Sequence, residues 1–63
     1  MWCFAIKEGK FEDFEKLCKK YGYEIENYYD DGWCDVFTGS EDEPTELHNE
    51  CIKKGLLDMS KYM

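Results

Sequence analysis

Three short segments of the chain have the pattern of β-strands. Residues 2–6 alternate with a period of two, which is typical of a strand, and Gly9 closes this stretch. Residues 23–29 and 33–38 are rich in aromatic and β-branched side chains, and Asp30-Asp31-Gly32 lies between them. Because Asp-Gly tolerates the positive φ angles of a tight reversing turn, we expect these two segments to form an antiparallel hairpin.

A helical period follows the first predicted strand. Between residues 10 and 21 apolar side chains recur at helical spacing, and acids and lysines fill the remaining positions. Acids lead and lysines follow, which suits the helix dipole, and Gly22 lies where a left-handed residue often ends a helix. The apolar positions expected to face the core are Phe11, Phe14, Leu17, Cys18 and Tyr21.

A second helix is predicted after the hairpin. Ser40 and Glu43 have the spacing of a capping box, Pro44 suits the first helical turn, and Gly55 should end the helix. Its inner stripe should consist of Leu47, Cys51 and Ile52. The chain should then fold back over the end of this helix through Leu56, Leu57 and Met59. We expect residues 60–63 to form a frayed tail.

These elements predict an α+β fold in the order strand, helix, strand, strand, helix. The expected architecture is a three-stranded sheet, including the antiparallel hairpin, packed by two helices. A length of 63 residues indicates a single compact domain, residues 1–63, with one thin core. Apolar residues make up 43% of the chain and aromatic residues 17%, which is too much for a disordered acidic tail.

The sequence also indicates a compartment. No apolar stretch is long enough to span a membrane, and the short apolar start lacks the length and the basic leader of a signal peptide. We therefore expect a cytoplasmic protein with no membrane contact. In that reducing compartment Cys3, Cys18, Cys34 and Cys51 should remain free thiols, with Cys18 and Cys51 on the apolar stripes of their helices.

Charge is distributed unevenly along the chain. The net charge is -7, all eight basic residues are lysine, and ten acids but no lysine lie between Tyr21 and Ile52. The absence of arginine disfavours direct nucleic-acid binding, because the planar guanidinium suits bidentate phosphate recognition. The candidate partner-binding residues are Glu24, Glu26, Tyr28, Asp30, Asp31, Trp33, Asp35, Glu41, Asp42, Glu43 and Glu46.

Strand alternation predicts how some of these candidates are arranged. It places Glu24, Glu26 and Tyr28 on one face of the hairpin, and it places Trp33, Asp35 and Phe37 together on either the same face or the opposite one. Acids would then alternate with large aromatic side chains. Alternatively, the acids serve solubility, and Trp33 and Phe37 point into the core.

Metal and catalytic chemistry have weaker support. His48 and Cys51 lie about one helical turn apart, but the four cysteines fall at intervals of 15 to 17 residues, unlike the close pairs of zinc sites. The hairpin acids with Asp35 and Glu41 lack the ligand spacing of a calcium loop. Nothing in the spacing fixes His48 near Cys34 or Cys51 as a base and its nucleophile. We expect no metal site, no cofactor and no enzymatic activity.

The sequence favours an interaction protein. Carboxylates could occupy a groove in which another protein's basic residues normally grip phosphates, so we expect the partner to be a nucleic-acid-binding protein with a basic groove or patch. The profile resembles, in size and charge, that of phage-encoded inhibitors of restriction or CRISPR nucleases, and this resemblance implies a DNA-mimic inhibitor. The alternative is an oligomer-forming or structural module whose interface uses Trp2, Trp33 and the tyrosines. A monomer and a small homo-oligomer are both compatible with the sequence.

Overall fold

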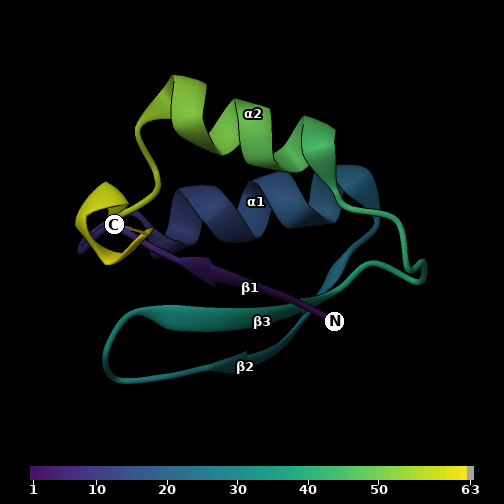
Figure 1. Cartoon of the computed structure of the whole chain (residues 1–63), viewed down its shortest axis with the longest axis horizontal. Helices are drawn as coiled ribbons and strands as arrows, with labels where there is room; N and C mark the ends of the chain where they lie inside the picture. The colour runs from purple at the N-terminus through teal and green to yellow at the C-terminus, as the bar shows by residue number, and fades with distance from the viewer. Residues whose placement is uncertain (63) are drawn as a thin grey trace.

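The computed structural model describes residues 1–62 and shows a three-stranded sheet with both helices on one face (Figure 1). The elements are β1 (Trp2–Ala5), α1 (Phe11–Tyr21), β2 (Glu24–Tyr28), β3 (Trp33–Phe37), α2 (Thr45–Lys54) and the 3-10 helix η1 (Met59–Tyr62). The predicted α+β class and the predicted order of strands and helices are confirmed. Within the described residues, no helix is long and apolar enough to cross a membrane.

The hairpin strand β3 lies at the centre of the sheet. The strand order is β1-β3-β2, and β3 runs antiparallel to both neighbours. In the register, Phe4 lies opposite Cys34, and both Trp2 and Ile25 lie opposite Val36. Residues paired in this way share a face of the sheet, so this set marks the face that packs against the helices.

A β-bulge in β2 overturns the predicted alternation of the hairpin. Ile25 pairs with Val36, but Asn27 pairs with the adjacent Asp35, so Glu26 is an extra residue. Glu24, opposite Phe37, therefore lies on the face away from the helices, whereas Tyr28 lies on the helix side. The Tyr28 ring stacks on that of Phe11 with centroids 4.0 Å apart. The prediction that Glu24 and Tyr28 share a face was wrong.

The core lies between the helices and the sheet. Its buried apolar residues are Phe4, Ile6, Phe14, Leu17, Cys18, Cys34, Val36, Leu47, Cys51, Leu56 and Leu57. Ala5 is also buried, but it lies opposite Trp33 on the other face of the sheet. Gly22 and Gly55 end the two helices at φ angles of 76° and 68°, as predicted. Ile52, however, is 49% exposed and does not belong to the buried stripe of α2. Leu56 and Leu57, which follow the helix, are buried in the core instead.

The predicted capping box does not form at the start of α2. The helix begins at Thr45, and no side chain of the described part of the chain caps it. Ser40 lies in the preceding loop, where its hydroxyl oxygen accepts a hydrogen bond from the Asp42 N–H at 3.0 Å. This hydrogen bond within the loop takes the place of the predicted capping hydrogen bond to the first turn of the helix.

The C-terminal segment closes the outer edge of β1. Leu57 forms a bridge with Ile6, and the Asp58 N–H donates to the Ala5 carbonyl at 2.9 Å. The Ala5 N–H donates in turn to the Tyr62 hydroxyl at 2.7 Å. Residues 60–62, predicted as frayed, therefore lie in a short helix that caps a sheet edge. Met63 lies outside the described residues.

Candidate protein-interaction surface

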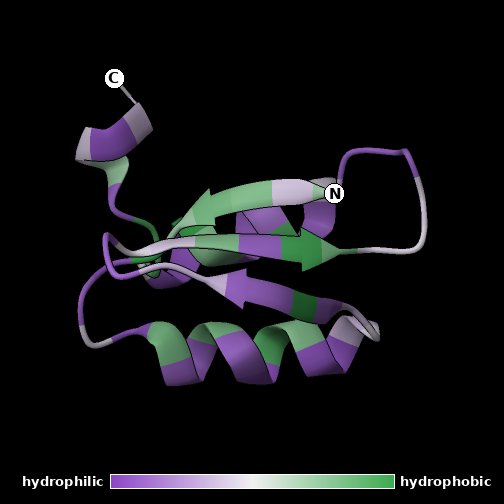
Figure 2. Cartoon of the chain, turned by 90° about the horizontal axis from the view of Figure 1, so that it is seen from below, coloured by the Kyte–Doolittle hydropathy of each residue, from purple (hydrophilic) through white to green (hydrophobic). Residues whose placement is uncertain are grey.

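The face of the sheet away from the helices carries a surface that we call the open face. Its residues are Cys3, Glu24, Asn27, Tyr29, Trp33, Asp35 and Phe37. Figure 2 views the sheet from this side, and no helix lies in front of the strands. Two of these side chains are carboxylates and none is a lysine, so the open face is acidic and contains no basic group of its own.

Asp35 lies at the centre of the open face and is held by its neighbours. The Cys3 Sγ–H donates to Oδ1 of Asp35 at 3.1 Å. The Tyr29 hydroxyl donates to Oδ2 at 2.8 Å, and the Asn27 side-chain amide lies 3.4 Å from the same oxygen. Since Cys3 and Asn27 are the cross-strand partners of Asp35, the sheet register itself brings these groups together.

These hydrogen bonds decide the protonation states of the cluster. Donation from Cys3, followed by donation from Tyr29, lowers the pKa of Asp35 below its usual value, so it is a carboxylate at neutral pH. The same bonds to Asp35 raise the pKa of the Cys3 thiol and of the Tyr29 hydroxyl. Cys3, although exposed, is therefore poorly suited to act as a thiolate nucleophile.

Large aromatic side chains flank Asp35 along β3. Trp33 and Phe37 lie two residues before and after Asp35 and so project from the same face. Phe37 is 49% exposed, while Trp33 is partly buried with its ring centroid 5.6 Å from that of Tyr62. Neither side chain faces the helices, which removes the alternative that they belong to the core. Both are available at the surface beside a fixed carboxylate.

The predicted partner-binding residues do not form one continuous patch. Glu24, Trp33 and Asp35 come together on the open face. Asp30 and Asp31 lie at the hairpin tip, where the Asp31 carboxylate accepts the Trp33 N–H at 3.1 Å. The loop beyond the other end of β3 carries Glu41, Asp42 and Glu43. Glu26 lies at the bulge, Tyr28 on the helix side, and Glu46 in the first turn of α2.

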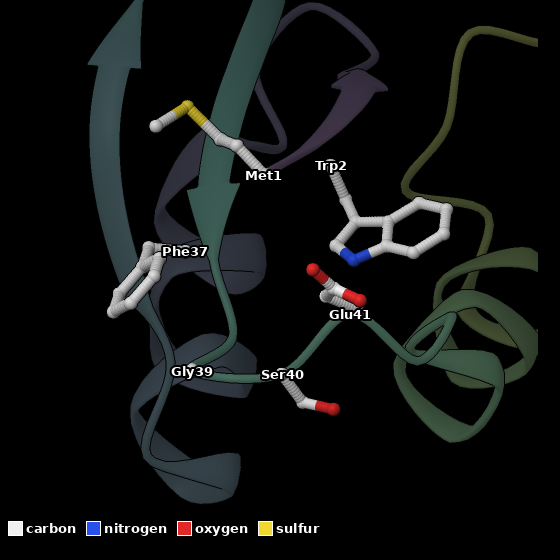
Figure 3. A pocket seen from close by; sticks show the side chains of 6 residues that line it. All are labelled: Met1, Trp2, Phe37, Gly39, Ser40 and Glu41. Atoms are coloured by element: carbon white, nitrogen blue, oxygen red, sulfur yellow. The ribbon is translucent and has the colours of Figure 1, made fainter.

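A hollow lies at the end of the sheet, between Phe37 and the acidic loop. It has a volume of about 370 Å³ and is lined by Met1, Trp2, Phe37, Gly39, Ser40 and Glu41 (Figure 3). The indole Nε1 of Trp2 is buried and has no hydrogen-bond partner among the described residues, and in Figure 3 it points towards Glu41. Phe37 thus borders both the polar cluster around Asp35 and a hollow of mixed polarity at the sheet's end.

Sequence reasoning missed several residues of this surface. Cys3, Asn27 and Tyr29 were not candidates, because their roles depend on the strand order and on the bulge. The available signal was the presence of polar side chains, Asn27 and Asp35, within two otherwise β-prone stretches. Such positions in a hairpin are candidates for an exposed, hydrogen-bonded cluster.

The cysteines and His48 show no arrangement for metal chemistry in the part of the chain that the structure describes. No group of three or more His, Cys, Asp or Glu side chains among residues 1–62 could hold a metal ion. Burial raises the pKa of Cys18 and Cys34 to about 12 and that of Cys51 to about 11, so these thiols are neutral core groups. His48 lies edge-on to the Phe4 ring at 6.0 Å, with Nδ1 4.0 Å from a Glu43 oxygen.

The surface as a whole offers contact chemistry: a fixed carboxylate, a second carboxylate at Glu24, and exposed aromatic faces. Carboxylates beside exposed aromatic side chains are common at protein-binding sites in general, and carboxylates attract positively charged groups. In comparisons with known proteins, no family model, no curated protein and no solved structure matches this chain.

Proposed function

We propose that this chain is an interaction protein that binds and blocks a basic, nucleic-acid-binding surface of another protein. The observation that supports this most is its uncompensated charge. Ten acids lie in the lysine-free span between Tyr21 and Ile52. Among the described residues, the one lysine–carboxylate pair within 4.0 Å joins Lys20 to Glu50, so the other carboxylates of that span are not neutralised by close lysine contacts.

Such a surface suits a partner that normally binds phosphates. Lysines and arginines in a nucleic-acid groove are attracted to carboxylates by the same Coulomb forces, and the attraction accelerates association. The acids at the hairpin tip, on the open face and in the loop at residues 41–43 would meet different parts of an extended groove. The proposed protein is thus a DNA-mimic inhibitor of the anti-CRISPR or anti-restriction type, without enzymatic activity and without direct nucleic-acid binding.

Self-association through the open face is a second candidate function. Phe37 and Tyr29 are each about half exposed, at 49% and 48%, which is the feature that favours it. In a second copy, however, the same face brings the same two carboxylates, and like charges placed across an interface oppose binding. A homo-oligomer would therefore tighten as salt increases, whereas binding to a basic partner would weaken.

The test is an affinity pull-down from a bacterial lysate with the tagged chain, washed in parallel at low and high salt. Bound proteins are identified by mass spectrometry. We expect to capture a nucleic-acid-binding protein that high salt releases. Once purified, this partner should lose its DNA or RNA binding as the acidic chain is added. Recovery of only the chain itself, or of a salt-resistant partner without a basic groove, would contradict the proposal.

A matched variant sharpens this experiment. Glu24→Gln with Asp35→Asn removes both carboxylates of the open face while preserving side-chain size. Capture of the nucleic-acid-binding protein should fall with this variant. Analytical ultracentrifugation of the unmodified chain at both salt concentrations separates the second candidate, because self-association would appear there without any partner.

A further inference from the structure

Asp35 has room for one more hydrogen-bond donor. A carboxylate offers about four acceptor positions, and the donors from Cys3, Tyr29 and Asn27 occupy three of them. Oδ2 receives two of these donors, but within residues 1–62 Oδ1 receives only the Cys3 thiol, a weak donor. A strong donor from outside would therefore complete the coordination of Oδ1 without displacing the Tyr29 hydroxyl.

The carboxylate is also oriented before any partner arrives. Its three donors come from β1, from β2 and from the residue that follows β2, on both sides of the central strand. Fixing a charged side chain in advance reduces the ordering cost that binding would otherwise impose. Of the two acids on the open face, Asp35 is the one held in this way, since Glu24 is exposed at the first position of β2.

The residues on either side of Asp35 along β3 are aromatic. Alternate residues on one face of a strand are about 7 Å apart, so Trp33 and Phe37 leave the backbone on either side of Asp35 and project from the same face. A guanidinium group can donate to a carboxylate while its plane lies against an aromatic ring, whereas an ammonium group is a compact and strongly hydrated charge. The arrangement favours arginine over lysine.

We propose that the open face binds an arginine side chain of the partner, which donates to Asp35 and packs against Phe37 and Trp33. This inference rests on the proposed function, because it names the chemical group in the basic groove that this surface recognises. A second copy of the chain cannot supply that group, since the sequence contains no arginine. The occupant is therefore a different, basic protein.

The test uses the full chain, labelled with ¹⁵N, and a synthetic peptide in which four arginines alternate with serines. Matched peptides carry lysine or the uncharged citrulline at the arginine positions. Titration at low ionic strength should shift the amides of Asn27, Asp35 and Phe37 together with the indole N–H of Trp33. The arginine peptide should bind several-fold more tightly than the lysine peptide, and the citrulline peptide should cause no shift.

Substitutions then locate the interaction. Asp35→Asn should lower the affinity for the arginine peptide roughly fivefold, which is the upper range for an exposed ion pair. Phe37→Leu should bring the arginine and lysine affinities closer together, since it removes the ring but keeps an apolar side chain. The control is the triple variant Glu41→Gln, Asp42→Asn, Glu43→Gln, which removes more charge from the loop and should weaken binding less than Asp35→Asn. Dispersed spectra of each free variant establish that it is folded.

The outcomes separate this inference from the proposed function. If both basic peptides bind equally and shift residues 41–43, the arginine site is wrong, while a diffuse acidic mimic remains supported. If a captured nucleic-acid-binding protein binds Asp35→Asn and Phe37→Leu as tightly as the unmodified chain, the site is again wrong and the function stands. If neither basic peptide shifts any resonance at low salt, both proposals are contradicted.

Discussion

Tyr62 uses a single hydroxyl to satisfy the edge of the sheet. Its oxygen accepts the Ala5 N–H at 2.7 Å, where an unpaired edge strand would otherwise present a free donor. We expect Tyr62→Phe to lower the free energy of unfolding by about 1–3 kcal/mol, the cost of leaving a partly buried donor unsatisfied. Amide hydrogen exchange at Ala5 should accelerate.

Tyr29→Phe is the control for this prediction. It also removes one hydroxyl hydrogen bond, but that bond is to the Asp35 side chain and not to the backbone. Exchange at Ala5 should remain slow in this variant. Equal exchange rates at Ala5 in Tyr62→Phe and in the unmodified chain would show that η1 does not protect the edge of β1.

The three buried thiols give a prediction about pH. Burial is the main cause that raises the pKa of Cys18 and Cys34 to about 12 and of Cys51 to about 11, from 9.0. A raised pKa in the folded state means that the unfolded chain loses its thiol protons first, so stability is full below pH 9 and falls as pH rises towards these values. Denaturant unfolding followed at pH 8, 9 and 10 should show this decline.

Thiol labelling provides the independent check. At pH 8 a disulfide reagent should modify one thiol per folded chain, the exposed Cys3, and all four cysteines in denaturant. The Cys3→Ser variant should show no accessible thiol in the folded chain. Fast modification of three or four thiols in the folded chain would contradict the burial on which the pH argument depends.

The sequence predicted the burial of single residues well where that burial depends on the periodicity of one helix. Cys18 and Cys51 lie on helical stripes, and both are buried as expected. The hydrogen bonds of Asp35 were beyond prediction, because they depend on which strands become its neighbours. A residue's environment within a helix follows from local spacing, but a cross-strand environment follows from pairing between distant segments.

At the scale of elements, α2 shows how far a periodic pattern can be trusted. Leu47 and Cys51 were predicted to be buried, and they are, whereas Ile52 is 49% exposed. Leu56 and Leu57 complete the apolar contact by folding back beneath the end of the helix. A short helix needs only a narrow stripe when the following segment covers the rest of the core.

The two leucine-sized positions of α2 supply a matched pair of substitutions. Leu47→Ala should reduce the free energy of unfolding by about 2–5 kcal/mol, because it opens a cavity in the core. Ile52→Ala should cost less than about 1 kcal/mol, since half of the side chain is already in water. Denaturant melts followed by circular dichroism measure both. Similar losses for the two variants would indicate that α2 is rotated relative to this arrangement.

The elements themselves were predictable, but their irregularities were not. Periods of two and of 3.6 located the three strands and the two α-helices of the described residues, but not η1, and glycines with positive φ marked the ends of the α-helices. The bulge at Glu26 and the failed cap at Ser40 arise from competition between local hydrogen bonds and the regular pattern. Because the bulge reverses the facing of Tyr28 relative to Glu24, one extra residue altered the predicted surface.

At the scale of the whole molecule, charge opposes the fold. The described chain measures 26 × 23 × 23 Å and carries a net charge of -7 over its full sequence. At about 0.01 M salt the Debye length is about 30 Å, so every carboxylate interacts with every other across the molecule. At about 0.15 M it is about 8 Å, and only neighbouring charges still repel.

We therefore expect salt to stabilise the folded chain. Raising sodium chloride over this range at neutral pH should increase the melting temperature by several degrees, since about 1 kcal/mol corresponds to roughly 4–8 °C in a domain of this size. The triple variant Glu41→Gln, Asp42→Asn, Glu43→Gln should start from a higher melting temperature at low salt and respond less to added salt. Binding to the basic groove of a partner should act as added salt does, and it should raise the melting temperature most where ionic strength is lowest. A melting temperature independent of salt in both the unmodified chain and the triple variant would mean that self-repulsion does not oppose folding. The acids would then not lower stability, and no binding partner would be needed to account for such a loss.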